Sequence, residues 1–260
     1  MSWELDHVFL TVPDLVRSER LLTEFGMSFT ARVAHRGQGT INACAMFENA
    51  FFELLAAHDL AELESEVVKP LGLHQRIQWL GTGACPFGVC FGLSDGAIAG
   101  AALPFQTWPY APPYVGAGAS IPIVTPRGRS REPLLFLSTR PRASFRTAHT
   151  VHRGSLRTLT KICVTLPPLT EPISEGVRWF AQQGSFALKN GPMSRSPPLT
   201  RRSTASTSRN SRWVNCLQTA TSASHLPLRR ISSSHSRNSS ASSSSAGMKE
   251  LVAGNVPLTG

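Results

Sequence analysis

Two nine-residue stretches, LDHVFLTVP at residues 5–13 and LTKICVTLP at residues 159–167, decide the expected fold of this 260-residue chain. Each is typical of a strand that ends in Thr, an apolar residue and Pro, and each precedes a helical pattern that stops at Gly26 or Gly184. An ordered recurrence of this kind indicates two copies of one supersecondary unit packed together, with chance similarity of two strand–helix units as the alternative.

The segments after the first helix complete one such unit. Residues 29–33, 40–47 and 51–56 are predicted strands, so the first 56 residues follow the order β-α-β-β-β. Residues 60–68 and 74–80 are predicted helices, and residues 85–93 a further strand. Residues 103–126, rich in Pro and aromatic residues, are predicted to be ordered loop, with short strands flanking Pro122 and Pro133.

The expected fold class is therefore α+β, with two βαβββ modules packed together. We expect a first module with an extension at residues 3–140 and the start of a second, incomplete module at residues 155–192. Residues 193–260 are expected to be a disordered tail rich in Ser and Arg, because residues 194–246 contain 18 serines, eight arginines and no acidic residue.

Charge divides the chain at the same place. Residues 1–193 carry 17 basic and 15 acidic residues, whereas residues 194–260 carry nine basic and one acidic residue. Nucleic-acid binding through the tail is one interpretation, although the arginines are scattered and aromatic stacking partners are scarce. A flexible tail without function is a second. A shifted reading frame near codon 193 is a third, and it explains why the change falls where the second module needs strands.

Cysteine usage and the N-terminus indicate a cytoplasmic protein. The five cysteines form no CxxC pair and their number is odd, which argues against a disulfide framework and against a thiolate zinc site. Residues 1–7 carry acids where a signal peptide would need basic residues, and no apolar run reaches the length of a membrane span.

Two residues are candidates for chemistry. Strand periodicity places Leu5, His7, Phe9 and Thr11 on one face of the first strand, so that His7 points toward a cavity. Glu53 lies in an otherwise apolar strand, where a carboxylate is costly to bury without a cation or several donors. Together they are part of a ligand set for zinc, nickel, manganese or iron. The alternatives for Glu53 are a pair with an arginine such as Arg32, or contact with water.

Further polar and aromatic residues are candidates for binding a substrate. Gln38, Thr40 and Asn42, with His35, are predicted to line the cleft, or else to form a turn held by its own hydrogen bonds. Trp108, with Tyr110 and Tyr114, is a candidate for an aromatic wall over a ligand, with ordinary loop packing as the alternative.

These motifs, taken in order, resemble the vicinal oxygen chelate superfamily. The resemblance rests on Leu-Asp-His at residues 5–7, Phe-Glu-Leu-Leu at residues 52–55 and the repeat at residue 159, and it covers residues 3–192. The stretch HRGQGTIN at residues 35–42 and Pro-Phe-Gly at residues 86–88 resemble its glyoxalase-like subgroup.

The resemblance implies paired βαβββ modules whose curled mixed sheet surrounds a cleft. It also implies a metal held by a His or Gln from the first strand and a Glu from the last strand of each module. His7 and Glu53 match the first pair. Lys161 matches the position of His7 in the second module, and an ammonium is a poor ligand. Residues 210–212, Asn-Ser-Arg, stand where the second Glu is expected, so the implied metal site is incomplete.

Three functions remain open on the sequence. The first is an enzyme of the vicinal oxygen chelate type, a lyase, isomerase or dioxygenase-like protein, in which Glu53 is a ligand or a base and a homodimer completes the site. The second is a non-catalytic module that binds a small anionic molecule through Lys161. The third is nucleic-acid binding through the tail.

Overall fold

The computed structural model of the chain describes residues 2–94, 103–139, 151–153, 156–191 and 251–253. The strands are β1 (Trp3–Thr11), β2 (Val33–His35), β3 (Thr40–Met46), β4 (Phe51–Ala57), β5 (Phe87–Leu93), β6 (Trp108–Tyr110), β7 (Ile121–Ile123), β8 (Leu134–Leu137), β9 (Ile162–Leu166), β10 (Phe186–Asn190) and β11 (Leu251–Ala253). The helices are α1 (Leu15–Glu24), α2 (Leu60–Leu63), α3 (Leu73–Ile77), α4 (Trp79–Thr82) and α5 (Glu175–Ala181), with short 3-10 turns η1 (Lys69–Leu71) and η2 (Pro113–Val115).

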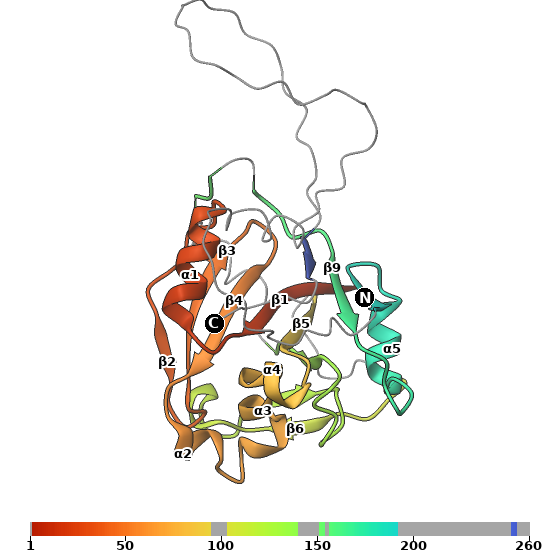
Figure 1. Cartoon of the computed structure of the whole chain (residues 1–260). Helices are drawn as coiled ribbons and strands as arrows, with labels where there is room; N and C mark the ends of the chain where they lie inside the picture. The colour runs from red at the N-terminus through yellow and green to blue at the C-terminus, as the bar shows by residue number, and fades with distance from the viewer. Residues whose placement is uncertain (1, 95–102, 140–150, 154–155, 192–250, 254–260) are drawn as a thin grey trace, which may run out of the picture.

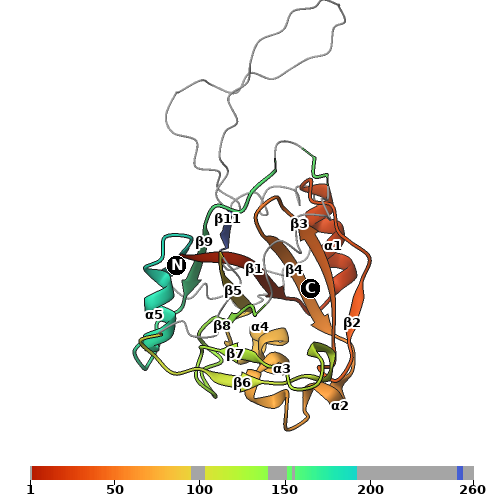
Figure 2. The ribbon, with the colours of Figure 1, turned by 180° about the vertical axis from the view of Figure 1, so that it is seen from behind.

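The predicted α+β class is confirmed. Eight strands form one curled sheet in the order β2-β3-β4-β1-β5-β8-β7-β6 (Figures 1 and 2). β1 pairs in parallel with β4, and β5 pairs in parallel with β8, while β1 and β5 run antiparallel between them. The sheet is therefore two four-stranded halves of matching strand order, joined along the β1–β5 seam.

The second half of the sheet comes from a different part of the chain than the repeat predicts. Its strands β5, β6, β7 and β8 lie within residues 87–137. β6 occupies a segment expected to be loop, whereas β7 and β8 lie at Pro122 and Pro133, where short strands are predicted. Residues 155–192, where the second module is predicted to start, form β9, α5 and β10. The two strands pair with β11 in a separate three-stranded sheet of order β10-β9-β11. The strand and the helix lie where the pattern predicts them, but strand pairing depends on contacts that one segment does not reveal. The division into domains remains a prediction.

The tail largely falls outside the described residues. Within residues 193–260 the structure describes residues 251–253, which form β11 parallel to β9. The predicted disorder of this segment concerns residues that lie outside the described part of the chain. In the parts of the chain that are described, no helix is long and apolar enough to cross a bilayer.

The first helix shows why the sequence predicts its boundaries. The Asp14 carboxylate accepts a hydrogen bond from the Arg17 backbone N–H at 2.9 Å, which caps the first turn. Gly26 follows the helix with a φ of +110°, a conformation that L side chains rarely adopt. The helix lies over β3 and β4 on the outer side of the sheet (Figure 1), and α5 lies at the opposite side of the molecule.

The two faces of the sheet pack into two apolar clusters. The outer cluster contains Val8, Leu54 and Phe91 and extends to Phe180 of α5 and Ile162 of β9. The inner cluster joins Phe9 and Leu55 of the sheet to Leu71, Leu73 and Ile77 beneath it. The inner face is only partly filled, and the space that remains forms a cavity.

One irregularity in β1 corrects the predicted face of Leu5. Leu5 pairs with Phe91 and His7 pairs with Cys90, so β1 uses two residues where β5 uses one. This β-bulge moves Leu5 into the outer cluster and turns both Asp6 and His7 toward the inner face. Strict alternation places His7 and Phe9 correctly but fails at Leu5, because the extra residue breaks the two-residue period.

Candidate active site

The inner face of the sheet encloses a cavity of about 550 Å³. Both halves of the sheet contribute to its wall, including Phe9 and Phe51 from the first half and Phe136 from the second. Ionisable groups on the wall are Asp6, His7, His35, Glu53, Cys44, Cys90, Tyr110 and Tyr114. Among the described residues of this wall there is no lysine or arginine. A volume of this size suits a small organic molecule.

Asp6, His7 and Cys90 meet at the seam between the two halves. Nδ1–H of His7 donates to Oδ1 of Asp6 across 2.5 Å, and the imidazole ring stacks on Phe51 with centroids 4.2 Å apart. Cys90 lies directly opposite His7 in the β1–β5 pairing. Donor atoms of the three residues all lie within 4.8 Å of one another. His7 is therefore held in one orientation by a carboxylate and by an aromatic ring.

Glu53 projects from β4 into the same cavity. It is 6% exposed, and its Oε1 accepts a hydrogen bond from the Asn42 amide at 2.7 Å. The alternative pairing with Arg32 does not occur, because that guanidinium pairs with Glu19 at 2.9 Å. The strand neighbour thus supplies a donor that fixes the position of a buried carboxylate.

His35 extends this polar wall. Nε2 of His35 lies 3.3 Å from the Asn42 amide nitrogen, and Nδ1 lies 3.1 Å from Oγ1 of Thr40. Because the Asn42 amide is a donor, Nε2 accepts and the ring proton resides on Nδ1. Burial lowers the pKa of His35 below its ordinary value of 6.5, although the charge of Glu53 opposes that shift. The imidazole is consequently neutral at physiological pH.

Gln38 connects the turn between β2 and β3 with the far wall. Its Nε2 donates to Thr40 at 2.8 Å, and its Oε1 accepts hydrogen bonds from the hydroxyls of Tyr110 at 3.0 Å and Tyr114 at 2.7 Å. Gln38 lines the cavity, whereas Thr40 is fully buried behind it. The predicted polar group at residues 38–42 is thus brought together, with Thr40 supporting the residues that line the wall.

The turn itself is held from outside, which the sequence did not predict. The Glu62 carboxylate of α2 accepts hydrogen bonds from the backbone N–H of Gly37 and of Gly39. Gly39 has a φ of +75°, and a Cβ there would lie 2.3 Å from the Asp59 carbonyl oxygen. The turn therefore requires glycine and presents a fixed edge to the cavity.

Two predicted binding residues lie elsewhere. The Trp108 indole donates to the Thr125 carbonyl oxygen at 2.9 Å, and the Arg127 guanidinium lies 4.7 Å from its ring centroid, outside the cavity wall. Lys161 immediately precedes β9 in the smaller sheet and does not line the cavity either. Of the predicted aromatic wall, Tyr110 and Tyr114 reach the cavity.

The sequence predicts His7 and Glu53 as a pair of metal ligands, but the structure brings a different set of donor side chains together. Within the described residues, one group of three or more His, Cys, Asp or Glu donors comes together, and it contains Asp6, His7 and Cys90 but not Glu53. Oδ2 of Asp6 is buried and has no hydrogen-bond partner. A divalent cation fits this group, since it would satisfy that oxygen and accept the mixed oxygen, nitrogen and sulfur donors.

Strand pairing also revises the second-module positions. Glu53 lies two residues beyond Phe51, the β4 partner of His7, and Ser138 lies two residues beyond Phe136, the β8 partner of Cys90. Cys90 and Ser138 therefore stand where the resemblance placed Lys161 and residues 210–212. Sequence reasoning missed Asp6 and Cys90, because the β-bulge at Asp6 and the register of Cys90 against His7 follow from strand pairing.

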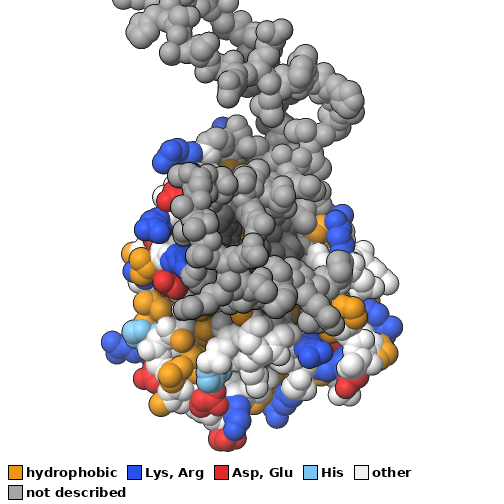
Figure 3. All heavy atoms as spheres, viewed as in Figure 1, with side chains coloured by type: hydrophobic (Ala, Val, Ile, Leu, Met, Phe, Trp, Pro, Cys, Tyr) orange, Lys and Arg blue, Asp and Glu red, His pale blue; other side chains and the backbone are white. Residues whose placement is uncertain are grey.

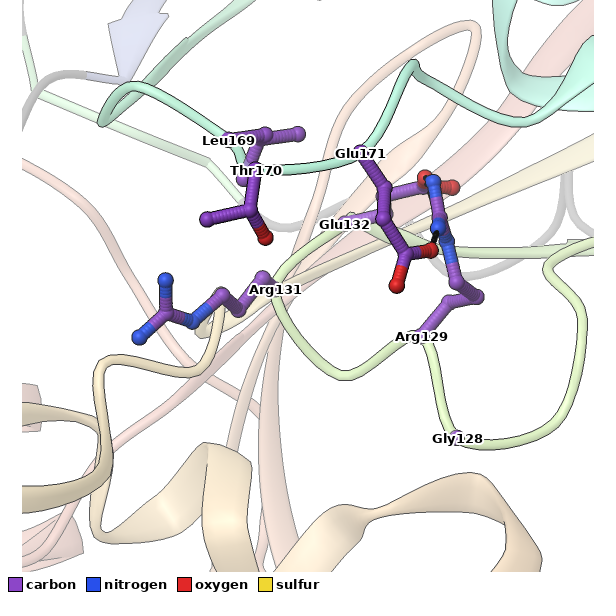
Figure 4. Close-up of a pocket in the computed structure, with 7 residues that line it drawn as sticks. All are labelled: Gly128, Arg129, Arg131, Glu132, Leu169, Thr170 and Glu171. Atoms are coloured by element: carbon purple, nitrogen blue, oxygen red, sulfur yellow. Dashed lines mark hydrogen bonds and ion pairs between the residues drawn. The ribbon is translucent and has the colours of Figure 1, made fainter.

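A second pocket, of about 100 Å³, lies between residues 128–132 and residues 169–171 (Figure 4). Arg129 reaches the carboxylates of Glu132 and Glu171, while Arg131 points away from them. Glu132 also accepts hydrogen bonds from the backbone N–H and the hydroxyl of Ser174, the residue before α5. Arg129 is paired with Glu132 and Glu171, and through Ser174 this cluster anchors α5 to the main sheet.

The described surface shows no segregation of charge on the face seen in Figure 3. Basic and acidic side chains alternate with hydrophobic ones over its lower half. That mixture agrees with the nearly balanced charge of residues 1–193.

Comparison with known proteins gives one family and several solved structures that are similar at low identity. The family described as the glyoxalase-like domain matches residues 5–153, which is more than half of the chain. No curated protein matches the sequence. A hypothetical protein from Staphylococcus aureus is similar at 13% identity and a TM-score of 0.36, with 56% of this chain and 62% of that protein covered. The match thus spans less than two thirds of that relative.

Two further solved structures are similar at low identity. A hypothetical protein from Bacillus halodurans has 17% identity and a TM-score of 0.34, with 53% of this chain and 94% of that chain covered. Methylmalonyl-CoA epimerase from Mycobacterium tuberculosis has 16% identity and a TM-score of 0.33, with 54% of this chain and 90% of that chain covered.

Proposed function

We propose that this chain, which belongs to the glyoxalase-like domain family, is an enzyme that moves a proton on a small carbonyl compound bound in the cavity. The observation that carries the proposal is the buried Glu53 carboxylate, which Asn42 holds on the cavity wall. A buried carboxylate with one oxygen fixed by an amide is suited to accept a proton from a substrate carbon.

The surrounding residues would bind and orient the substrate. Gln38 and Asn42 present polar groups at one side of the cavity, and Phe9, Phe51 and Phe136 supply an apolar wall. Thr40 keeps the Gln38 amide in place from behind. Since burial keeps His35 neutral, this imidazole adds no positive charge that would weaken Glu53 as a base.

Removing a proton next to a carbonyl leaves negative charge on oxygen. The wall already holds the carboxyl groups of Asp6 and Glu53, so a further anion needs a cation nearby. A divalent ion at the group formed by Asp6, His7 and Cys90 would act as a Lewis acid on the substrate oxygens. Glu53 would remain available as the base, because Asn42 and not the ion fixes its position.

Proton exchange with solvent tests this function even though the product is unidentified. The purified protein is incubated in deuterated buffer with a panel of small 2-hydroxy and 1,2-dicarbonyl compounds, and loss of the C–H signal is followed by nuclear magnetic resonance. Catalysed exchange of at least one compound is expected, and Glu53→Gln should reduce its rate by at least about 100-fold.

The matched control is Glu48→Gln, since Glu48 is exposed and is not among the residues that line the cavity. This variant should exchange at the rate of the unmodified protein. If compounds bind but none exchanges, the chain is instead a module that binds a small ligand without turning it over. Equal exchange by Glu53→Gln would remove Glu53 from the proposed role.

A further inference from the structure

A separate cavity of about 350 Å³ lies outside the candidate active site, between residues 66–76 and residues 126–134. We call it the basic pocket. The described residues of its wall include four cationic side chains and one carboxylate: Lys69, Arg76, Arg127, Arg129 and Glu66. Leu71 and Leu134 line both this pocket and the larger cavity, so the two spaces lie back to back. A concave surface with an excess of positive charge favours an anionic ligand.

Arg76 is the buried cation of this wall, with 1% of its surface exposed. Its Nε donates to the Leu71 carbonyl oxygen at 3.1 Å, and its Nη1 donates to those of Cys85 at 2.8 Å and Glu132 at 2.7 Å. Its Nη2 donates to the Arg129 carbonyl oxygen across a longer 3.5 Å. Because Nη2 carries two N–H groups, it retains a donor for a ligand.

The charge of Arg76 is only partly compensated by the fold. The carboxylates of the described residues form no ion pair with it. Burial lowers the pKa of Arg76 from 12.5 to about 10, although Cys85 and Glu132 oppose that shift. The Glu132 carboxylate is itself bonded to Arg129 and Ser174. An anion in the basic pocket would therefore stabilise a buried guanidinium whose direct acceptors are neutral carbonyl groups.

Lys69 of η1 and Arg127 of the loop between β7 and β8 are the exposed cations of the pocket. Within the part of the chain that the structure describes, neither forms an ion pair. The Arg127 guanidinium lies 4.7 Å from the Trp108 ring centroid, a contact that holds it in place. Arg129 is paired with carboxylates outside the wall, so three cations face the single carboxylate of Glu66 and leave a net charge of +2.

We propose that the basic pocket binds a phosphate group, either as free phosphate or as a small phosphate monoester. Phosphate oxygens would accept from Arg76 at the buried end and from Lys69 and Arg127 at the open end. A phosphate monoester carries a charge of about −1.5 to −2 at pH 7, which matches the wall better than a single carboxylate does. The inference goes beyond the proposed function, because this ligand lies outside the cavity that holds Glu53.

Calorimetric titration of the full chain at low ionic strength tests the site, with inorganic phosphate and glycerol phosphate as the two probes. Saturable binding of one phosphate group per chain is expected. Lys69→Gln and Arg127→Gln should each weaken that binding by about 10-fold, since each removes a charge-assisted contact. Arg76 is kept, because its bonds to backbone carbonyls support the fold. The basic segment after residue 193 is the same in every variant, so its contribution cancels.

Lys189→Gln and Arg20→Gln are the matched controls, because both residues are exposed, lie outside the pocket wall and lose the same charge. Both should retain the affinity of the unmodified protein. Tighter binding of glycerol phosphate would assign the site to phosphate esters, and equal or weaker binding would assign it to free phosphate. The inference is overturned if neither probe binds, or if the two control variants lose as much affinity as the two pocket variants.

Discussion

At the scale of single residues, Asn42 connects the base to the rest of the polar wall. Its amide donates to Glu53 and also lies within hydrogen-bond distance of His35. We predict that Asn42→Ala destabilises the protein by about 1–3 kcal/mol, because a buried carboxylate loses its donor. Urea unfolding measures this cost. In a Glu53→Gln background the same substitution should cost less, and an unchanged cost would show that the hydrogen bond does not position Glu53.

His35 should make stability depend on pH in a defined direction. Since burial lowers its pKa below 6.5, the unfolded chain binds a proton at this group more readily than the folded protein does. The stabilisation is therefore fully present above about pH 6.5 and is lost as the pH falls toward the lowered folded value. Urea unfolding between pH 7.5 and 5 should show a steeper loss than in His35→Gln.

The control for this experiment is His58→Gln, because His58 is exposed and outside the cavity. Its pH profile should match that of the unmodified protein. Identical profiles for all three proteins would contradict the burial-driven shift at His35.

Several site residues could be predicted from the sequence for a physical reason. Glu53 interrupts an apolar strand, and His7 and Asn42 alternate with apolar residues, so their cavity side follows from a two-residue period. Gln38 lies in the turn between β2 and β3, where its neighbouring glycines mark a loop. The cavity position of Asp6 was not predicted, because a β-bulge in β1 breaks that two-residue period. Cys90 was not predicted as a site residue, because in sequence it resembles any other small buried residue. Only its pairing with His7 across β1 and β5 brings it into the site. Lys161 was a candidate because the second module was assigned to the repeat at residue 159, and that segment forms the smaller sheet. Trp108 was a candidate for an aromatic wall with ordinary packing as the alternative, and it lies outside the cavity wall.

At the scale of elements, the seam between β1 and β5 holds the two halves together and supports the proposed ion site. Gly88 on β5 lies under the ring of Phe9 on β1, and a Cβ at residue 88 would lie 2.1 Å from Phe9 Cε1. We predict that Gly88→Ala destabilises the protein by about 1–3 kcal/mol through overpacking. Thermal unfolding of the variant provides the measurement.

A matched control is Gly81→Ala in α4, where a Cβ meets nothing within 4 Å. Alanine there should leave stability unchanged or raise it slightly, because glycine is a poor helix former. Adding Phe9→Leu to Gly88→Ala should recover part of the loss. If Gly88→Ala is as stable as the unmodified protein, the close approach of β1 and β5 is not as described.

The elements also show where sequence patterns stop being informative. Periodicity identifies β1, α1, β3, β4 and β5, which are long or strongly apolar. β6 and β7 are three residues each and include prolines, so they present no two-residue period to recognise. The repeat near residue 159 is recognisable as strand and helix, but its own residues do not reveal its sheet partners.

At the scale of the whole molecule, the eight-stranded sheet provides a cavity with a division of roles. One side of the wall, at the seam, gathers Asp6, His7 and Cys90, and another side presents Glu53 fixed by Asn42. All five residues lie before residue 91, within the family match at residues 5–153. The proposed chemistry therefore does not depend on the Ser- and Arg-rich segment after residue 193, and the hypothesis of a shifted reading frame there remains to be tested on the transcript.

The most direct test of this division is a crystal structure of the zinc-loaded protein with anomalous scattering recorded at the zinc edge. We predict one anomalous peak in the cavity, within ligand distance of Asp6 Oδ2, a ring nitrogen of His7 and Sγ of Cys90, with Glu53 still bonded to Asn42. A peak bound by His7 and Glu53 without Asp6 and Cys90, or a cavity without a peak, would contradict the account.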